Sequence, residues 1–445
     1  MLCIQTNKNN EKKGKRNMID IFRKIYRDHL LKNSIYLIMT NFSSMVIGFA
    51  FWMIATRFYT PSDIGIISAI LSSMTLIAII SSVGLPMAMT LYLPVNVQNA
   101  SRIINSCIIV GIIVSVTLSL IFILGVDIWV GYMKILLVSL KVNIIFIMTT
   151  MMTTISLCMV GIFTAGRRSS FHMIKENIFG MTKIILLILL SSFGAIGIFM
   201  SWSIGLTIAI AIGFFLTSKL WKYKPTLIID PIIKSMARFS IGNYIAGIFY
   251  NIPKFIFPIL IVNTLSTESA GYFFIAMAIA GVFYGIPEAI AGPFLTESSD
   301  KEKFWNNVYK VIKFDMYLLI PGLILLLIFG KFALNIFNPN YAEHSFNTLI
   351  ILSLVSIPLS LITTFNMVRN AQKKVEAAIK IDAAVTIMTL ILSIYFMRIW
   401  NIEGIAISYL FANTLIAAFI ILRIAKNPIE FTLRLIKGDT KDIGY

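Results

Sequence analysis

The sequence repeats TPSDIG of residues 60–65 as STESAG at residues 266–271, an offset of 206 residues. The same offset relates AGRR of residues 165–168 to AQKK of residues 371–374. The chain therefore consists of two halves with the same layout. Duplicated membrane proteins commonly place a solute site between the two copies and rock one copy against the other. The repeat thus points toward transport.

The composition is that of an integral membrane protein. Hydrophobic residues make up 58% of the 445 residues, charged residues make up 13%, and the mean hydropathy is +0.86. Soluble domains, in contrast, carry about 25% charged residues. Cys3, Cys107 and Cys158 are isolated, and the three histidines lack the spacing of metal ligands. We therefore expect no disulfide framework, no metal site and no cofactor.

Apolar stretches long enough to cross a membrane recur through both halves. A helix needs about 20 apolar residues to span about 30 Å of hydrocarbon, and the alternation typical of barrel strands is absent. The expected spans are residues 34–57, 64–85, 102–125, 134–164, 173–193, 196–217, 239–262, 271–294, 310–330, 346–368, 378–397 and 402–423. Six spans per half keep the two copies in the same orientation. The sequence therefore predicts an all-α membrane protein with twelve transmembrane helices in two parallel six-helix bundles.

The distribution of lysine and arginine predicts the orientation, because these residues favour cytoplasmic loops. With a cytoplasmic N-terminus, 31 of the 38 lysine and arginine residues fall on the inner side. Only Arg57, Lys134, Lys331 and Arg398 fall on the outer side. We expect a multi-pass protein of the cell membrane with both termini in the cytoplasm. The same bias accounts for the net charge of +18 without a nucleic-acid partner.

The expected segments follow from these spans. They are a basic cytoplasmic segment (1–33), an N-terminal bundle (34–217), a cytoplasmic linker (218–238), a C-terminal bundle (239–423) and a cytoplasmic tail (424–445). The first segment could form a basic interfacial helix on the inner membrane surface, or it could be a charged tail that only fixes the orientation. Met18 is an alternative start to Met1. All loops are short, and no phosphate-binding loop or nucleophile motif is recognisable, so we do not expect an enzyme.

Polar residues inside the membrane are then the functional candidates, because they are costly there. The seventh span carries several of them on one helical face, namely Ser240, Asn243, Gly247, Asn251, Lys254 and Pro258. Lys254 lies about 24 Å from Arg238 along the helix at 1.5 Å per residue, which predicts a cation in the outer half of the bilayer. Asn41 of the first span occupies the position equivalent to Gly247 in the repeat. This stripe lines either a polar cavity or a seam of close helix packing.

Other charged residues within the spans have two interpretations each. Lys183 is expected near mid-bilayer, either as a second cation of the cavity or in a pair with a carboxylate. Glu288, Asp315 and Asp382 fall within roughly 10 Å of the inner face by the same helical rise. These acids could carry protons or a coupling cation, or they could pair with lysines of the inner side.

Three stretches resemble one family. Residues 57–65 (RFYTPSDIG), residues 243–258 followed by 268–272 (ESAGY), and residues 337–341 (FNPNY) are similar to the corresponding parts of polysaccharide-biosynthesis membrane proteins. The resemblance covers nearly all of residues 30–425. It implies a lipid-linked oligosaccharide flippase of the O-antigen type, within the multidrug, oligosaccharidyl-lipid and polysaccharide exporter superfamily. It also implies a V-shaped pair of bundles around a cationic lumen, with Arg57, Lys183 and Lys254 as the lumen cations.

These observations predict a flippase that moves a polyprenyl-(pyro)phosphate-linked oligosaccharide outward by alternating access. In this hypothesis Lys254 neutralises phosphate, while Asn41, Asn243 and Asn251 bond sugar hydroxyls. The expected partners are the lipid-linked glycan, membrane lipids, and glycan polymerase or glycosyltransferase machinery. The alternative is a cation-coupled multidrug exporter of the same superfamily, but such exporters usually hold a carboxylate in the first span, and residues 34–57 contain none. A membrane enzyme would need a large outer loop or an intramembrane histidine with acid partners.

Overall fold

The computed structural model describes residues 29–126, 139–226, 229–296, 301–372 and 374–426. Within these ranges every regular element is a helix. The first half contains α2 (His29–Phe58), α3 (Pro61–Ser81), α4 (Leu85–Val95), η1 (Val97–Asn99), α5 (Ala100–Leu124), α8 (Leu140–Ala165), α9 (Ser169–Leu189), η3 (Ser191–Phe193) and α10 (Ala195–Trp221). The second half contains α11 (Ile232–Thr264), α12 (Thr267–Thr296), α13 (Lys301–Phe337), α14 (Pro339–His344), α15 (Phe346–Leu354), α16 (Ser356–Ala371) and α17 (Val375–Lys426). The predicted basic segment and tail lie largely outside the described residues.

The number of spans is not fixed by length and composition alone. Ten stretches in the described part are long and apolar enough to cross a membrane. One of them, Val375–Arg423, has 49 residues and contains non-helical backbone at Trp400 and Asn401, where two helices meet. The 21-residue helix α9, which carries three charged residues, is not among the ten. The chain is a multi-pass helical membrane protein, and the count of twelve spans stays a prediction.

The second predicted span ends earlier than expected. The expected span is 64–85, but α3 stops at Ser81 and a separate short helix, α4, begins at Leu85. Val83 and Gly84 between them have positive φ angles of 48° and 69°. Such left-handed backbone cannot continue a right-handed helix, so the apolar run continues through a break.

The repeated turns begin equivalent helices. Thr60 caps α3 and accepts a hydrogen bond from the Asp63 amide, while Asp63 accepts one from the Thr60 amide, which forms a capping box. Pro61 follows at the first helical position, where its missing N–H has no cost. In the second copy the Ser266 hydroxyl accepts a hydrogen bond from the Ser269 amide at the start of α12. The repeat is therefore a repeated helix start.

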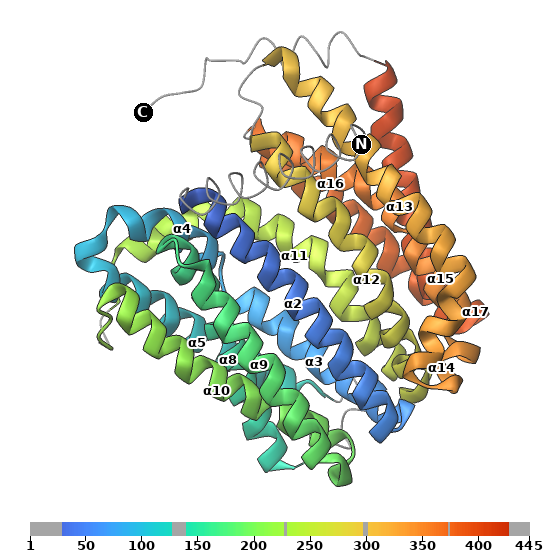
Figure 1. The fold of residues 1–445 in the computed structure, drawn as a ribbon, viewed down its shortest axis with the longest axis horizontal. Helices are drawn as coiled ribbons and strands as arrows, with labels where there is room; N and C mark the ends of the chain where they lie inside the picture. The colour runs from blue at the N-terminus through green and yellow to red at the C-terminus, as the bar shows by residue number, and fades with distance from the viewer. Residues whose placement is uncertain (1–28, 127–138, 227–228, 297–300, 373, 427–445) are drawn as a thin grey trace, which may run out of the picture.

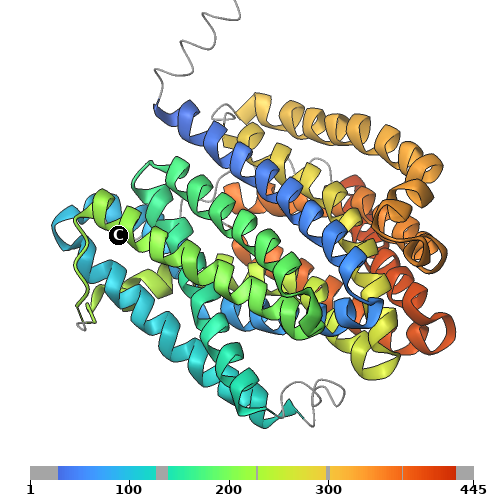
Figure 2. The same cartoon turned by 60° about the horizontal axis from the view of Figure 1, so that its bottom comes forward.

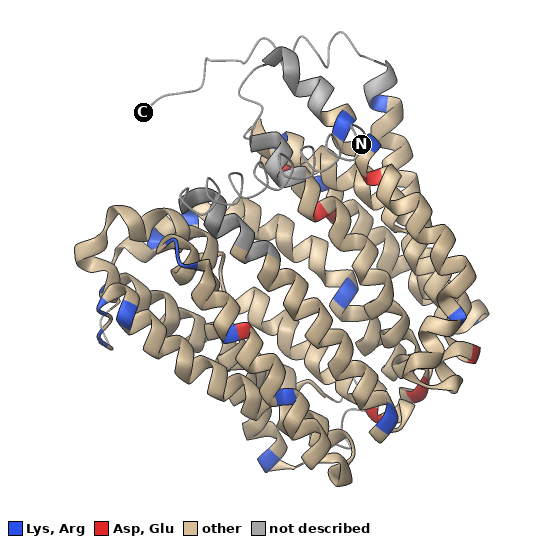
Figure 3. Cartoon of the chain, viewed as in Figure 1, with Lys and Arg blue, Asp and Glu red and all other residues tan. Residues whose placement is uncertain are grey.

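The two halves form two bundles that meet along α3. Helices α4 to α10 gather on one side and α12 to α17 on the other, with α2, α3 and α11 between them (Figures 1 and 2). Helix α3 packs against both α11 and α12 of the second half. The largest apolar core joins residues of both halves, including Phe51, Ile67, Phe257 and Phe273. Charged residues are sparse along the middle of the helices and more frequent toward their ends (Figure 3).

Candidate functional site

The ammonium group of Lys254 belongs to a cluster shared by α11 and α12. Its Nζ atom lies 3.6 Å from Oε1 of Glu288 and 4.1 Å from the ring centroid of Tyr250. The Tyr250 hydroxyl donates a hydrogen bond to the same oxygen of Glu288. Tyr250 and Lys254 are four residues apart on α11 and so share one face of the helix. One carboxylate thus holds both a cation and a phenol.

The pair joins Lys254 and Glu288, which were expected at different depths in the membrane from the rise of 1.5 Å per residue along each helix. Helices α11 and α12 are consecutive and antiparallel, and side chains in a helix lean toward its N-terminus. Lys254 therefore reaches away from the α11–α12 turn, while Glu288 reaches back toward it. The two charged groups meet between the levels of their own backbones. In the structure Glu288 is paired with a lysine, but this lysine is Lys254 within the membrane-spanning part and not a lysine of an inner loop.

The cluster is open on one side. The Lys254 side chain is 23% exposed and that of Glu288 is 46% exposed. Gly247, two turns before Lys254, and Gly281 and Gly285, on the Glu288 face of α12, have no atom within 4 Å of an added methyl group. Gly48 of α2 is equally uncrowded. The glycine positions on the helix faces of the charged pair are therefore not covered by neighbouring helices.

The predicted polar stripe of α11 divides into two parts. Ser240 is fully buried, and a methyl group on Gly84 would lie 2.8 Å from its hydroxyl oxygen, so this end is a packing seam. Asn243 and Asn251 are half-buried further along the helix. The Asn251 amide donates a 2.8 Å hydrogen bond to the Gly247 carbonyl of its own helix. Asn41 of α2 is exposed.

Lys183 lies in a different environment. It is only 6% exposed, and its Nζ atom is 4.7 Å from the ring centroid of Phe51, 4.6 Å from that of Phe179 and 4.1 Å from that of Trp202. These rings come from α2, α9 and α10. The electron-rich faces of aromatic rings attract a cation when water is excluded. Lys183 is therefore enclosed within the first half by aromatic rings.

Arg57 lies in the last turn of α2 at an exposed position. Its guanidinium donates a 2.9 Å hydrogen bond to the carbonyl of Ile336, close to the C-terminus of α13. The last carbonyls of a helix lack partners within the helix and carry its negative end charge. Arg57 therefore caps a helix of the other half in this structure.

The remaining acids are held by side chains of neighbouring helices. Asp315 is fully buried and accepts a 2.5 Å hydrogen bond from the Ser360 hydroxyl. Asp382 accepts a 2.7 Å hydrogen bond from the Asn366 amide. A cavity large enough for about one water molecule is lined by Asp382, Thr386 and Tyr250, among others. Tyr250 thus lies between this cavity and the Lys254–Glu288 pair.

A match to a family of known proteins covers more than half of the chain. The family described as polysaccharide biosynthesis protein matches residues 30–273. The chain belongs to this polysaccharide biosynthesis family. No curated protein sequence matches the chain.

Solved structures of transporters share the fold of this family member. A lipid II flippase, MurJ, in an inward closed conformation aligns with a TM-score of 0.70 and 15% identity, over 90% of this chain and 89% of that one. An inward-facing multidrug resistance MATE family transporter of the MOP superfamily aligns with a TM-score of 0.64 and 12% identity, over 90% of this chain and 96% of that one. A MATE transporter of Vibrio cholerae aligns with a TM-score of 0.57 and 14% identity, over 89% of this chain and 97% of that one. The expected all-α exporter fold is confirmed, and family and fold together support a membrane flippase or transporter.

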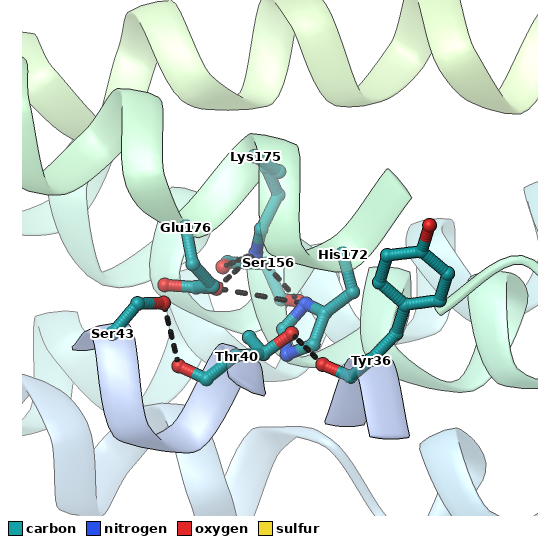
Figure 4. A network of polar contacts seen from close by, with 7 residues as sticks. All are labelled: Tyr36, Thr40, Ser43, Ser156, His172, Lys175 and Glu176. Carbon is teal, nitrogen blue, oxygen red and sulfur yellow. Dashed lines mark hydrogen bonds and ion pairs between the residues drawn. The ribbon is translucent and has the colours of Figure 1, made fainter. Parts of the chain in front are cut away.

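One polar network of this family member surrounds a buried lysine of α9 that was not among the candidate residues. Lys175 of α9 is 1% exposed, and its Nζ atom is 2.5 Å from the Ser156 hydroxyl and 2.8 Å from Glu176. His172 lies 3.8 Å from the same carboxylate (Figure 4). A methyl group on Gly213 would lie 3.6 Å from the Lys175 side chain, so α10 packs along it. The spacing of His172 and Glu176, four residues apart, was the available signal.

Proposed function

We propose that this protein flips a polyprenyl-(pyro)phosphate-linked oligosaccharide from the cytoplasmic to the outer leaflet by alternating access. The observation that carries the proposal is the Lys254–Glu288 pair beside the unfilled glycine faces of α11 and α12. The family membership and the likeness to a lipid II flippase support it. The protein would act in the cell membrane with both termini in the cytoplasm, beside the polymerase or glycosyltransferase machinery of a surface polysaccharide.

A charged glycan headgroup needs such a site because hydrocarbon offers it no hydrogen bonds. Each unsatisfied polar group costs several kcal/mol in that environment. A phosphate that takes the place of Glu288 beside Lys254 exchanges one anion for another, so the ammonium keeps a counter-ion throughout. Asn243 and Asn251 would bond sugar hydroxyls along the same helix, and Asn41 would do so from α2. The lipid tail would stay in the bilayer while the headgroup crosses.

Glycines beside the charged pair suit a bulky headgroup. Gly247, Gly281 and Gly285 leave space that any larger side chain would fill. A sugar chain could lie against the bare helix backbone there while its phosphate contacts Lys254. These glycine faces suit a small inorganic ion less well, because such an ion needs ligands in close contact.

Reconstitution into vesicles tests the proposal directly. Purified protein is placed in liposomes with a defined polyprenyl-pyrophosphate oligosaccharide, and a membrane-impermeant enzyme or lectin reports how much headgroup reaches the other leaflet. We expect transfer well above that of protein-free vesicles, and none for the same oligosaccharide without its lipid. Transfer equal to protein-free vesicles under both proton and sodium gradients would disprove the function.

A second candidate is a cation-coupled exporter of multidrug type. The MATE-like fold and the water-sized cavity at Asp382 favour it, with Glu288, Asp315 and Asp382 as coupling acids. Efflux of cationic dyes from cells that express the protein, lost when the proton or sodium gradient collapses, would support this candidate. Dye efflux at the level of empty cells, together with glycan transfer in vesicles, would reject it.

A further inference from the structure

The repeated turns of the two halves contact each other at the starts of α3 and α12. The Ser62 hydroxyl lies 2.7 Å from that of Thr267, which is a hydrogen bond between the two halves. A methyl group added to Gly65 would lie 1.7 Å from the Thr267 carbonyl oxygen, and one on Gly271 would lie 2.1 Å from that of Pro61. Equivalent glycines thus let the two backbones touch.

A second set of contacts lies at the same end of the molecule. The Thr56 hydroxyl and the Arg57 guanidinium, at the end of α2, donate to the carbonyls of Phe337 and Ile336 at 3.1 and 2.9 Å. These carbonyls belong to the last turn of α13, where no later helical N–H is available to them. Phe49 and Trp52 stack edge-on against Phe337 and Phe274 of the second half, with centroids 4.8 and 4.6 Å apart.

The opposite end is joined differently. There the Tyr244 hydroxyl donates to the Ile80 carbonyl, and Ser240 lies against Gly84, so the first part of α11 packs on the first half. At that end of the molecule, α12 and α13 diverge from α4 and α5 (Figure 1). The second half therefore contacts the first through α11 at one end and through α12 and α13 at the other.

We propose that Thr56, Arg57, Ser62 and Thr267, with the carbonyls of Ile336 and Phe337, form a latch that closes one end of the molecule and opens in each transport cycle. Apolar helix faces separate in lipid without a hydrophobic penalty, because lipid tails replace the lost contacts. Polar and close backbone contacts then decide how stable the closed end is. The paired repeat turns supply such contacts from both copies at once.

A reversible cross-link tests the latch, and its transport readout rests on the proposed function. In a background with Cys3, Cys107 and Cys158 replaced by alanine, Ser62→Cys and Thr267→Cys place two thiols within disulfide reach. We expect oxidation to reduce glycan transfer at least tenfold, and reductant to restore it. The matched control is Thr149→Cys with Ser203→Cys, whose hydroxyls are 2.8 Å apart within the first half. Its disulfide should leave transfer within twofold.

Three outcomes would overturn the latch. They are full cross-linking with unchanged transfer, absence of any cross-link at 62 and 267, and equal loss of transfer in the control pair. A second readout needs no substrate. Spin labels at Leu189 and Ile399, exposed on the two halves, should show a larger share of long distances when Arg57→Ala removes one tie. That shift without any glycan transfer would keep the latch and reject the proposed function, whereas an unchanged distance distribution would reject the latch.

Discussion

Two membrane lysines of this protein, Lys183 and Lys254, have opposite surroundings. Lys183 is enclosed by three aromatic rings and is 6% exposed. Lys254 has one ring, one carboxylate and an exposed fraction of 23%. Rings cannot be exchanged for a passing anion, but a carboxylate can. Of these two lysines, we infer that Lys254 carries an exchangeable charge and that Lys183 holds the first bundle together.

The largest expected effect is that of Lys254→Ala. Loss of the ammonium leaves the headgroup phosphate without a counter-ion in a poorly solvated site, so glycan transfer in vesicles should fall at least tenfold. Lys254→Arg should keep part of the activity, and Lys331→Ala is the matched control, since Lys331 also lies over an aromatic ring, 5.3 Å from that of Phe346. Undiminished glycan transfer by folded Lys254→Ala protein would show that Lys254 does not bind the headgroup phosphate, and the proposed functional difference between Lys254 and Lys183 would be wrong.

Glu288→Gln should sharpen the same difference. Without the competing carboxylate, Lys254 should bind a polyprenyl phosphate about tenfold more tightly, which is about 1.4 kcal/mol. Turnover should fall, because no anion returns to displace the headgroup. Competition binding and vesicle transfer measure the two quantities separately. Glu403→Gln is the control, a carboxylate held by Asn347 at 2.9 Å. Unchanged affinity would show that the pair is only structural.

Lys183→Ala should act on stability. Removing the side chain from among Phe51, Phe179 and Trp202 leaves a cavity, which costs about 2–4 kcal/mol for a large buried side chain. The thermal midpoint in detergent should fall, while transfer per folded molecule stays within twofold. Lys183→Met, which refills the space, should recover most of the midpoint. Loss of transfer at an unchanged midpoint would instead make Lys183 a lumen cation, as the family resemblance implies.

The smallest effect is expected at Gly247. Alanine there meets no atom within 4 Å and should stabilise α11 by about 0.5–1 kcal/mol, because glycine is the more flexible residue. Gly271→Ala is the contrasting variant, since its methyl group would lie 2.1 Å from the Pro61 carbonyl. A thermal midpoint that rises for Gly247→Ala and falls for Gly271→Ala would agree with open space at Gly247 and backbone contact at Gly271.

Particular residues show how far the sequence could lead. Helices and their duplication follow from apolar runs and from the repeated turn, because both are local patterns. Lys254 was predicted as a cation on a polar face, and it does lie in a half-open cluster with Tyr250. Its partner Glu288 was expected at another depth, because helical rise alone omits the reach of side chains. The rings around Lys183 come from Phe51 and Trp202 on other helices, and no periodicity within α9 indicates them.

The amino-acid sequence by itself determined that the chain is helical, membrane-embedded and duplicated, because hydrocarbon length, hydropathy and a repeated helix start are written in consecutive residues. Tertiary structure alone decided which lysine is enclosed and which is paired with an exposed acid. It also decided that the two copies of the repeated turn touch. Those outcomes depend on how helices far apart in the chain pack, and a lipid solvent leaves that choice to side-chain shape and polar contacts between helices.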